Sequence, residues 1–160
     1  MAQVETGERG ANVRFPPPLA YLAAILLGVG MRYVVAPLPV PVHWYVALAV
    51  GMAFVVAGLW LIADAVKLFR RTGQNPKPWK PSPELVLKGS YRFTRNPMYV
   101  GMTSIQIGIG LAVNNLWIVL LAPFSLLAVH FIAVLPEERY LTEKFGESYR
   151  GYLEKVRRYL

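Results

Sequence analysis

The sequence predicts an all-α, polytopic membrane protein with about four transmembrane helices and a C-terminal cytoplasmic amphipathic helix. Of its 160 residues, 55% are hydrophobic and 16% are charged, a smaller charged share than in an ordinary soluble domain. The hydrophobic residues gather in four stretches, at residues 19–36, 43–66, 98–113 and 116–135. Buried helices of a soluble bundle are the alternative, but these stretches lack the polar faces that such helices need.

The length of each stretch supports a membrane protein. A helix that crosses a hydrocarbon core of about 30 Å needs about 20 residues. The second and fourth stretches meet this length and the first is marginal. The third is short at 16 residues, so we expect it to extend into the interface or to tilt little.

Basic residues surround the predicted helices in an asymmetric pattern. They precede the first stretch, fill the connection between the second and third, and follow the fourth, whereas the connections 37–42 and 114–115 carry no charge. The positive-inside rule then predicts an even number of spans with both termini cytoplasmic. The net charge of +8 reflects this orientation and attraction to anionic headgroups, and no nucleic-acid partner is expected. We expect a prokaryotic inner membrane protein without a cleavable secretory signal.

The residue types that are rare in the chain exclude several kinds of chemistry. There is no cysteine, which excludes disulfides, thiolate metal sites and cysteine nucleophiles. His43 and His130 are the only histidines, so we predict no metal site.

We expect one domain over residues 1–160, with three distinct segments at its surface. Residues 1–18 form a polar, proline-rich tail, residues 70–97 a long polar loop, and residues 137–160 the amphipathic helix, in which Gly146 is a candidate bend. Five prolines prevent a continuous helix in the loop. Its end combines aromatic side chains with the donors of Arg95 and Asn96, a composition suited to wrapping a polar, partly aromatic ligand.

Acidic residues at two cytoplasmic helix ends each allow two interpretations. Glu137 and Glu138 could favour the dipole of a following helix, or they could bind the ammonium and vicinal hydroxyls of a ligand such as S-adenosylmethionine. Asp64 is either a functional intramembrane acid or the partner of Lys67 and Arg70 in an interfacial ion pair, and its spacing favours the ion pair.

Three sequence patterns occur in a fixed order over residues 83–158. They are Gly89-x-Tyr91-x-x-x-Arg95-Asn96-Pro97-Met98-Tyr99-x-Gly101, then Glu137-Glu138, then Phe145-Gly146-x-x-Tyr149-x-x-Tyr152. This order resembles the isoprenylcysteine carboxyl methyltransferase and phospholipid methyltransferase superfamily of integral membrane methyltransferases.

The resemblance implies a cytoplasmic site for S-adenosylmethionine, formed by the loop before the third span, the start of that span and the diacid. The cofactor-binding residues that it implies are Leu85 and Val86 through their backbone, Tyr91, Arg95, Asn96, Pro97, Met98, Tyr99, Gly108, Gly110, Glu137 and Glu138. Glu138 and Tyr99 are the candidate catalytic residues. For Gly108 and Gly110, close helix packing remains an equal alternative.

Two positions depart from the family pattern. Many relatives have histidine where this chain has Asn96, and an amide can bind a cofactor but cannot shuttle a proton as an imidazole does. Residues 132–135 are wholly apolar, whereas eukaryotic relatives place a basic residue shortly before their acidic cluster for the substrate carboxylate.

The resulting hypothesis is S-adenosylmethionine-dependent methylation of a lipid or lipophilic small molecule at the cytoplasmic membrane face. A non-catalytic membrane scaffold and a reductase that shares the fold are the alternatives. The sequence leaves open whether oxygen or nitrogen accepts the methyl group, and it does not give the oligomeric state.

Overall fold

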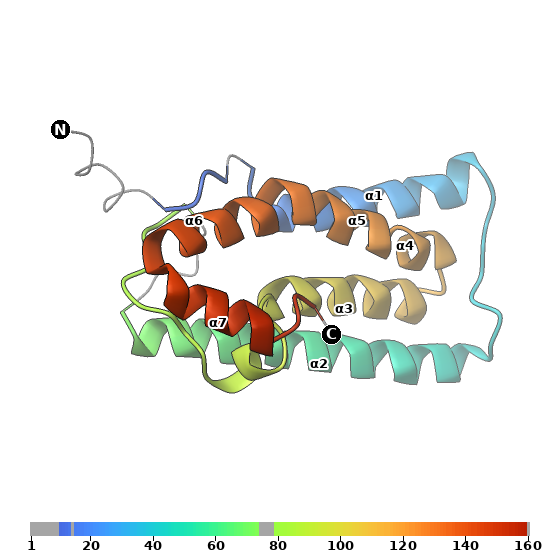
Figure 1. Ribbon diagram of the computed structural model, residues 1–160. Coiled ribbons are helices and arrows are strands. Elements are labelled where there is room, and N and C mark those ends of the chain that lie inside the picture. The colour runs from blue at the N-terminus through green and yellow to red at the C-terminus, as the bar shows by residue number, and fades with distance from the viewer. Residues whose placement is uncertain (1–9, 14, 74–78, 160) are drawn as a thin grey trace. The chain divides into compact units, whose positions relative to one another are not determined.

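The computed structural model describes residues 10–13, 15–73 and 79–159, which form two compact units. Unit 1 contains the described parts of residues 1–16, 63–97 and 130–160, and unit 2 contains residues 17–62 and 98–129. The regular structure of these described residues is entirely helical (Figure 1), which confirms the predicted all-α class. Most of the predicted tail over residues 1–18, and residues 74–78 of the predicted loop, lie outside the described residues.

Each predicted hydrophobic stretch is helical. The α-helices are α1 (Pro17–Val34), α2 (Trp44–Arg71), α3 (Pro97–Ala112), α4 (Leu116–Leu120), α5 (Ala122–Val129), α6 (Leu135–Phe145) and α7 (Glu147–Lys155). A 3₁₀ turn, η1 (Gly89–Arg92), precedes α3, and a π-helix, η2 (His130–Val134), joins α5 to α6. In the described part of the chain, three helical segments are long and apolar enough to cross a membrane, at residues 17–34, 44–71 and 116–145. Helix α3 has 16 residues, fewer than the usual span, so its crossing stays a prediction.

Helix α2 continues beyond the predicted stretch, which ended at Val66, as far as Arg71. Lysine, leucine and arginine are good helix formers, and cations in the last turn interact favourably with the helix dipole. The first residues of the predicted polar loop are therefore helical.

Within unit 2, α2 and α3 approach each other closely at two reciprocal glycine pairs. A Cβ atom placed on Gly58 would lie 2.5 Å from the Gly101 carbonyl oxygen, and one on Gly101 would lie 2.7 Å from the Gly58 oxygen. Gly51 and Gly108 face each other in the same way, at 2.6 and 2.5 Å. Small residues permit such backbone contact between membrane helices, where a hydrophobic driving force is absent.

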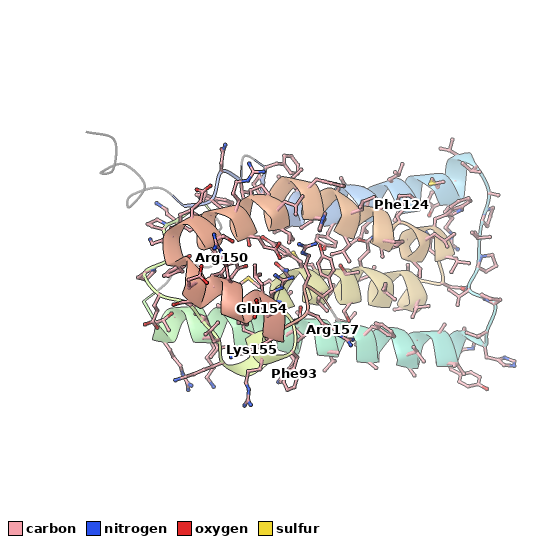
Figure 2. All side chains as sticks on the ribbon, in the orientation of Figure 1. Phe93, Phe124, Arg150, Glu154, Lys155 and Arg157 are labelled. Atoms are coloured by element: carbon pink, nitrogen blue, oxygen red, sulfur yellow. The ribbon has the colours of Figure 1, made fainter. Side chains whose placement is uncertain are left out.

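Helix α1 packs beside α4 and α5 in the same unit (Figure 1). Two buried amides connect helices of this unit: Asn115 Nδ2, before α4, donates to the Gly28 carbonyl of α1 at 3.0 Å, and Gln106 Nε2 of α3 donates to the Ile118 carbonyl of α4 at 3.1 Å. Phe124, labelled in Figure 2, has 65% of its surface exposed, as expected for a side chain that contacts lipid.

The predicted fourth stretch ended at Leu135, whereas the helical segment that begins at Leu116 continues through η2 into α6. Pro136 has no N–H group, and its ring would clash with the carbonyl of residue 132 in regular α-helix. Residue 132 belongs to the π-helix, whose wider turn accommodates the proline.

The structure corrects the single amphipathic helix that we predicted over residues 137–160. Helix α6 ends at Phe145, Gly146 adopts a left-handed φ of 52°, and α7 ends at Lys155. Beyond α7 the chain is extended at Val156, with φ −124° and ψ 133°. Glycine adopts a positive φ at low steric cost, so the candidate bend is a full break between two helices.

The glycine contacts predict a position-specific loss of stability. We expect Gly58→Ala to lower the thermal unfolding midpoint in detergent by several degrees, because overpacking costs about 1–3 kcal/mol. Gly30→Ala is the matched control, since nothing lies within 4 Å of a Cβ at Gly30 of α1. Equal midpoints for the two variants would contradict the close approach of α2 and α3.

Candidate functional site

The segment before α3 is fixed in unit 1 by a carboxylate of α2. Asp64 Oδ2 accepts a hydrogen bond of 2.8 Å from the backbone N–H of Ser90, the second residue of η1. Gly89 precedes it with a φ of 59°, and a Cβ there would lie 2.6 Å from the same Oδ2 atom. This hydrogen bond replaces the ion pair that we favoured for Asp64, which is in no ion pair among the described residues. Asp64 therefore positions the loop.

Tyr91 lies at the centre of an aromatic contact between α2, η1 and α7. Its ring stacks on Phe69 with centroids 5.6 Å apart, and its carbonyl oxygen accepts a hydrogen bond of 2.7 Å from the Tyr152 hydroxyl. Burial raises the pKa of the Tyr91 phenol well above its ordinary value, and the negative charge of Glu137 raises it further. Tyr91 is therefore neutral at physiological pH.

Glu138 binds two arginines that come from different segments. Arg158 Nε donates to Oε1 at 3.0 Å and Arg158 Nη2 donates to Oε2 at 2.8 Å, while Arg95 Nη1 lies 3.3 Å from Oε1. The side chains of Arg95 and Glu138 are only 11% and 13% exposed. These hydrogen bonds raise the pKa of Arg158 above its ordinary value. The sequence predicted Arg95 and Glu138 as site residues but gave no indication of Arg158.

Asn96 is buried and forms contacts within the protein. Its Nδ2 atom donates to the Arg158 carbonyl at 2.9 Å, and its backbone N–H donates to Thr94 Oγ1 at 3.2 Å. The amide thus holds the C-terminal backbone against the loop before α3. Figure 1 shows this adjacency, with the yellow-green loop next to the red C-terminal segment.

The two carboxylates of the diacid have different surroundings. Glu138 contacts the arginines, whereas the charge of Glu137 adds to the effect of burial in raising the pKa of Tyr91. Val134, before α6, has helical φ and ψ of −61° and −49°, so the helix continues from η2 without a free N-terminus. A stabilising effect on a helix dipole therefore does not explain the diacid.

Unit 1 brings together Arg95, Asn96 and Glu138 through direct contacts or through Arg158, and it also contains Tyr91, which contacts Phe69 and Tyr152. Leu85 and Val86 are half-buried in its irregular segment. Pro97 is buried at the start of α3. The other predicted residues, Met98, Tyr99, Gly108 and Gly110, belong to unit 2.

In unit 2, the Tyr99 carbonyl accepts a hydrogen bond of 3.1 Å from the Tyr21 hydroxyl. A Cβ on Gly108 would lie 2.5 Å from the Gly51 oxygen, and one on Gly110 would lie 2.7 Å from Val119 Cγ2. These distances support the close-packing interpretation of both glycines. Their role toward a cofactor stays a prediction.

Sequence reasoning missed three residues that organise the site: Ser90, Thr94 and Arg158. Arg158 follows another arginine after the last helix, and no local pattern distinguishes the two. Ser90 and Thr94 are small polar residues inside a recognised motif. Only their burial in the structure, at 2% and 1% exposure, distinguishes them.

Burial raises the pKa of Tyr152 from 10.0 to about 12, which predicts a pH-dependent stability difference. The folded protein retains this proton at pH values where the unfolded chain loses it. The stabilisation is therefore complete below about pH 10 and is lost as the pH rises through about 12. We expect Tyr152→Phe to cost about 1 kcal/mol at pH 8, and this cost to shrink as the pH rises above about 10, where the wild type begins to lose the stabilisation. Thermal unfolding in detergent across this pH range measures the stability difference between the two proteins. A difference independent of pH would contradict the raised pKa of Tyr152.

Comparisons with known proteins show which family the chain resembles. The model of the phospholipid methyltransferase family matches residues 46–148, which include every predicted site residue. The chain is also 38% identical over 74 residues to the protein-S-isoprenylcysteine O-methyltransferase of Schizosaccharomyces pombe. That match covers 45% of this chain and 30% of the yeast protein, so the chain corresponds to less than a third of its relative's length.

The family match covers more than half of the chain, from α2 into α7, and the similarity to the yeast enzyme supports it independently. The all-helical fold, with three segments suited to a membrane, agrees with both. The chain belongs to the phospholipid methyltransferase family of membrane methyltransferases.

Proposed function

We propose that this protein transfers a methyl group from S-adenosylmethionine to a lipid or lipophilic small molecule at the cytoplasmic face of a membrane. The observation that carries the proposal is the Arg95–Glu138 ion pair, which joins the loop before α3 to the diacid of α6 across 43 positions of sequence. These are the two segments in which the family resemblance leads us to expect the cofactor site.

The residues of unit 1 fit the chemistry of this cofactor. Arg95 Nε and Ser90 Oγ are buried atoms without a hydrogen-bond partner in the described part of the chain. A guanidinium N–H suits a carboxylate, and a hydroxyl can donate or accept. Glu138 retains acceptor capacity for an ammonium or a hydroxyl, and Tyr91 offers an aromatic surface. Unpartnered buried polar atoms are costly, and a bound ligand would relieve that cost.

Within this proposal the predicted residues have separate roles. Arg95, Glu137 and Glu138 bind the polar parts of the amino acid and ribose, Tyr91 packs near the adenosine, and Leu85 and Val86 contribute backbone groups. Asn96 supports the site through the C-terminal backbone. Pro97, Met98 and Tyr99 contribute the first turn of α3, and Gly108 and Gly110 allow it to pack closely. Residues 70–97 act as the cofactor-binding loop.

The cofactor supplies an already activated methyl group, so the protein's main task is to hold donor and acceptor in line, about 3–3.5 Å apart, and to exclude water. A carboxylate acceptor needs no base, whereas an amine must lose a proton. The guanidinium groups of Arg95 and Arg158 face most of the lone pairs of the Glu138 carboxylate, to which a proton would bind. Glu138 therefore suits binding better than proton transfer, which leaves Glu137 and Tyr99 as the proposed bases for an amine.

The proposed topology has four spans with both termini cytoplasmic, in a prokaryotic inner membrane, and it requires α3 to cross. The absence of native cysteine allows single-cysteine labelling without background. Lys88 precedes α3, Val113 follows it, and both are exposed. We expect a membrane-impermeant maleimide to label Val113→Cys in intact cells and Lys88→Cys only in inverted vesicles. Labelling of both from one side would show that α3 does not cross.

Calorimetry on detergent-purified protein tests the cofactor. We expect saturable binding of S-adenosylmethionine to the wild type and a loss of at least tenfold in affinity for Glu138→Gln, since a hydrogen bond to a charged group contributes about 1.5–3 kcal/mol. Glu143→Gln is the control, because Glu143 lies on α6 and is exposed.

A folded wild type that does not bind S-adenosylmethionine would overturn the proposal. Titration with a reduced nicotinamide in the same series then separates a reductase, which binds it, from a scaffold, which binds neither cofactor.

A further inference from the structure

Residues 156–159, called here the C-terminal segment, are attached to the loop before α3 by backbone hydrogen bonds. The Arg157 carbonyl accepts a hydrogen bond of 3.0 Å from the Arg95 N–H. The Arg158 carbonyl accepts two, from Thr94 Oγ1 at 3.1 Å and from Asn96 Nδ2 at 2.9 Å. Consecutive carbonyls of the segment are thus held by consecutive residues of the loop.

The side chains of the segment contact two further elements of unit 1. Arg158 binds Glu138 of α6, and the Tyr159 hydroxyl lies 2.8 Å from His130 Nδ1 in η2. The segment therefore joins the loop, the π-helix and the diacid, although it lies beyond residues 46–148 that match the family.

The hydrogen bonds and the ion pair on Glu138 leave one position for a further donor. An ionised carboxylate offers about four lone-pair sites. On Oε1 one accepts the hydrogen bond from Arg158 Nε and the other faces Arg95 Nη1 in the 3.3 Å ion pair, and one on Oε2 accepts from Arg158 Nη2. The remaining site is on Oε2.

The two arginines act differently on the carboxylate. Arg95 approaches through one nitrogen at 3.3 Å, which leaves the carboxylate free to rotate about its last bond. Arg158 approaches with two nitrogens, and the planar guanidinium fork fixes the plane of the carboxylate. The direction of the remaining lone pair on Oε2 therefore depends on Arg158.

We propose that Arg158 is a positioning residue of the cofactor site: its bidentate contact aims Oε2 of Glu138 at the ammonium or a ribose hydroxyl of S-adenosylmethionine. This inference rests on the proposed function and extends it to a residue outside the family match. The C-terminal segment is then part of the binding site, and its backbone attachments bring Arg158 to Glu138.

Arg158→Lys tests the role of geometry separately from that of charge. Lysine keeps the positive charge but cannot form the fork, and the substitution leaves the Arg158 backbone carbonyl and its two donors in place. We expect a rise of roughly tenfold in the Kd for S-adenosylmethionine by calorimetry. Arg157→Lys is the matched control, since the Arg157 side chain, labelled in Figure 2, is exposed.

A double-mutant cycle distinguishes positioning from a general structural role. If Arg158 acts through Glu138, Arg158→Lys changes the Kd by less than about twofold in a Glu138→Gln background, because the oriented acceptor is already lost. A purely structural role gives additive losses in the two backgrounds. If Glu138→Gln does not yield folded protein, the comparison of Arg158→Lys with Arg157→Lys decides alone.

The result for the wild type distinguishes a failure of the positioning role from a failure of the proposed function. A wild type that binds S-adenosylmethionine, with the same Kd in Arg158→Lys, overturns the positioning role and leaves the proposed function intact. A folded wild type without binding overturns both.

Discussion

The arrangement of unit 1 depends on the carboxylate of Glu138 and its two guanidinium partners. Arg95 comes from the loop before α3 and Arg158 from the chain after α7, so one side chain of α6 fixes two segments that have no regular structure of their own. A partly buried carboxylate requires such pairing, because an unpaired charge there would be costly. The same electrostatic requirement that stabilises the fold also gathers the residues proposed to bind the cofactor.

The contacts of unit 2 rest on a different principle. Its helices expose large apolar side chains, which lipid can solvate, so the glycine contacts of α2 and α3 must supply van der Waals packing and fix their relative position. The buried amides Gln106 and Asn115 donate to backbone carbonyls of α4 and α1. Unit 2 thus gains its order from close backbone approach, and unit 1 from charge pairing.

The sequence predicted the helices well because length and hydropathy are local properties. It located the loop and the diacid through a recognised motif, and the structure joins them through Arg95 and Glu138. It could not predict that Arg158 folds back onto Glu138, nor that Asp64 binds the backbone of Ser90, because these pairs are 20 and 26 positions apart and depend on tertiary structure. The single helix over residues 137–160 was wrong because helical spacing of apolar residues does not reveal the left-handed φ of Gly146.

The π-helix before Pro136 also sets the rotational phase of the diacid. A π turn contains about one residue more than an α turn, and one residue rotates a helix by about 100°. If residues 130–134 were wound as regular α-helix with the same number of residues, Glu138 would leave the helix axis in a direction roughly a quarter turn away from its present one. The π winding of this short segment therefore sets the direction in which Glu138 leaves the helix.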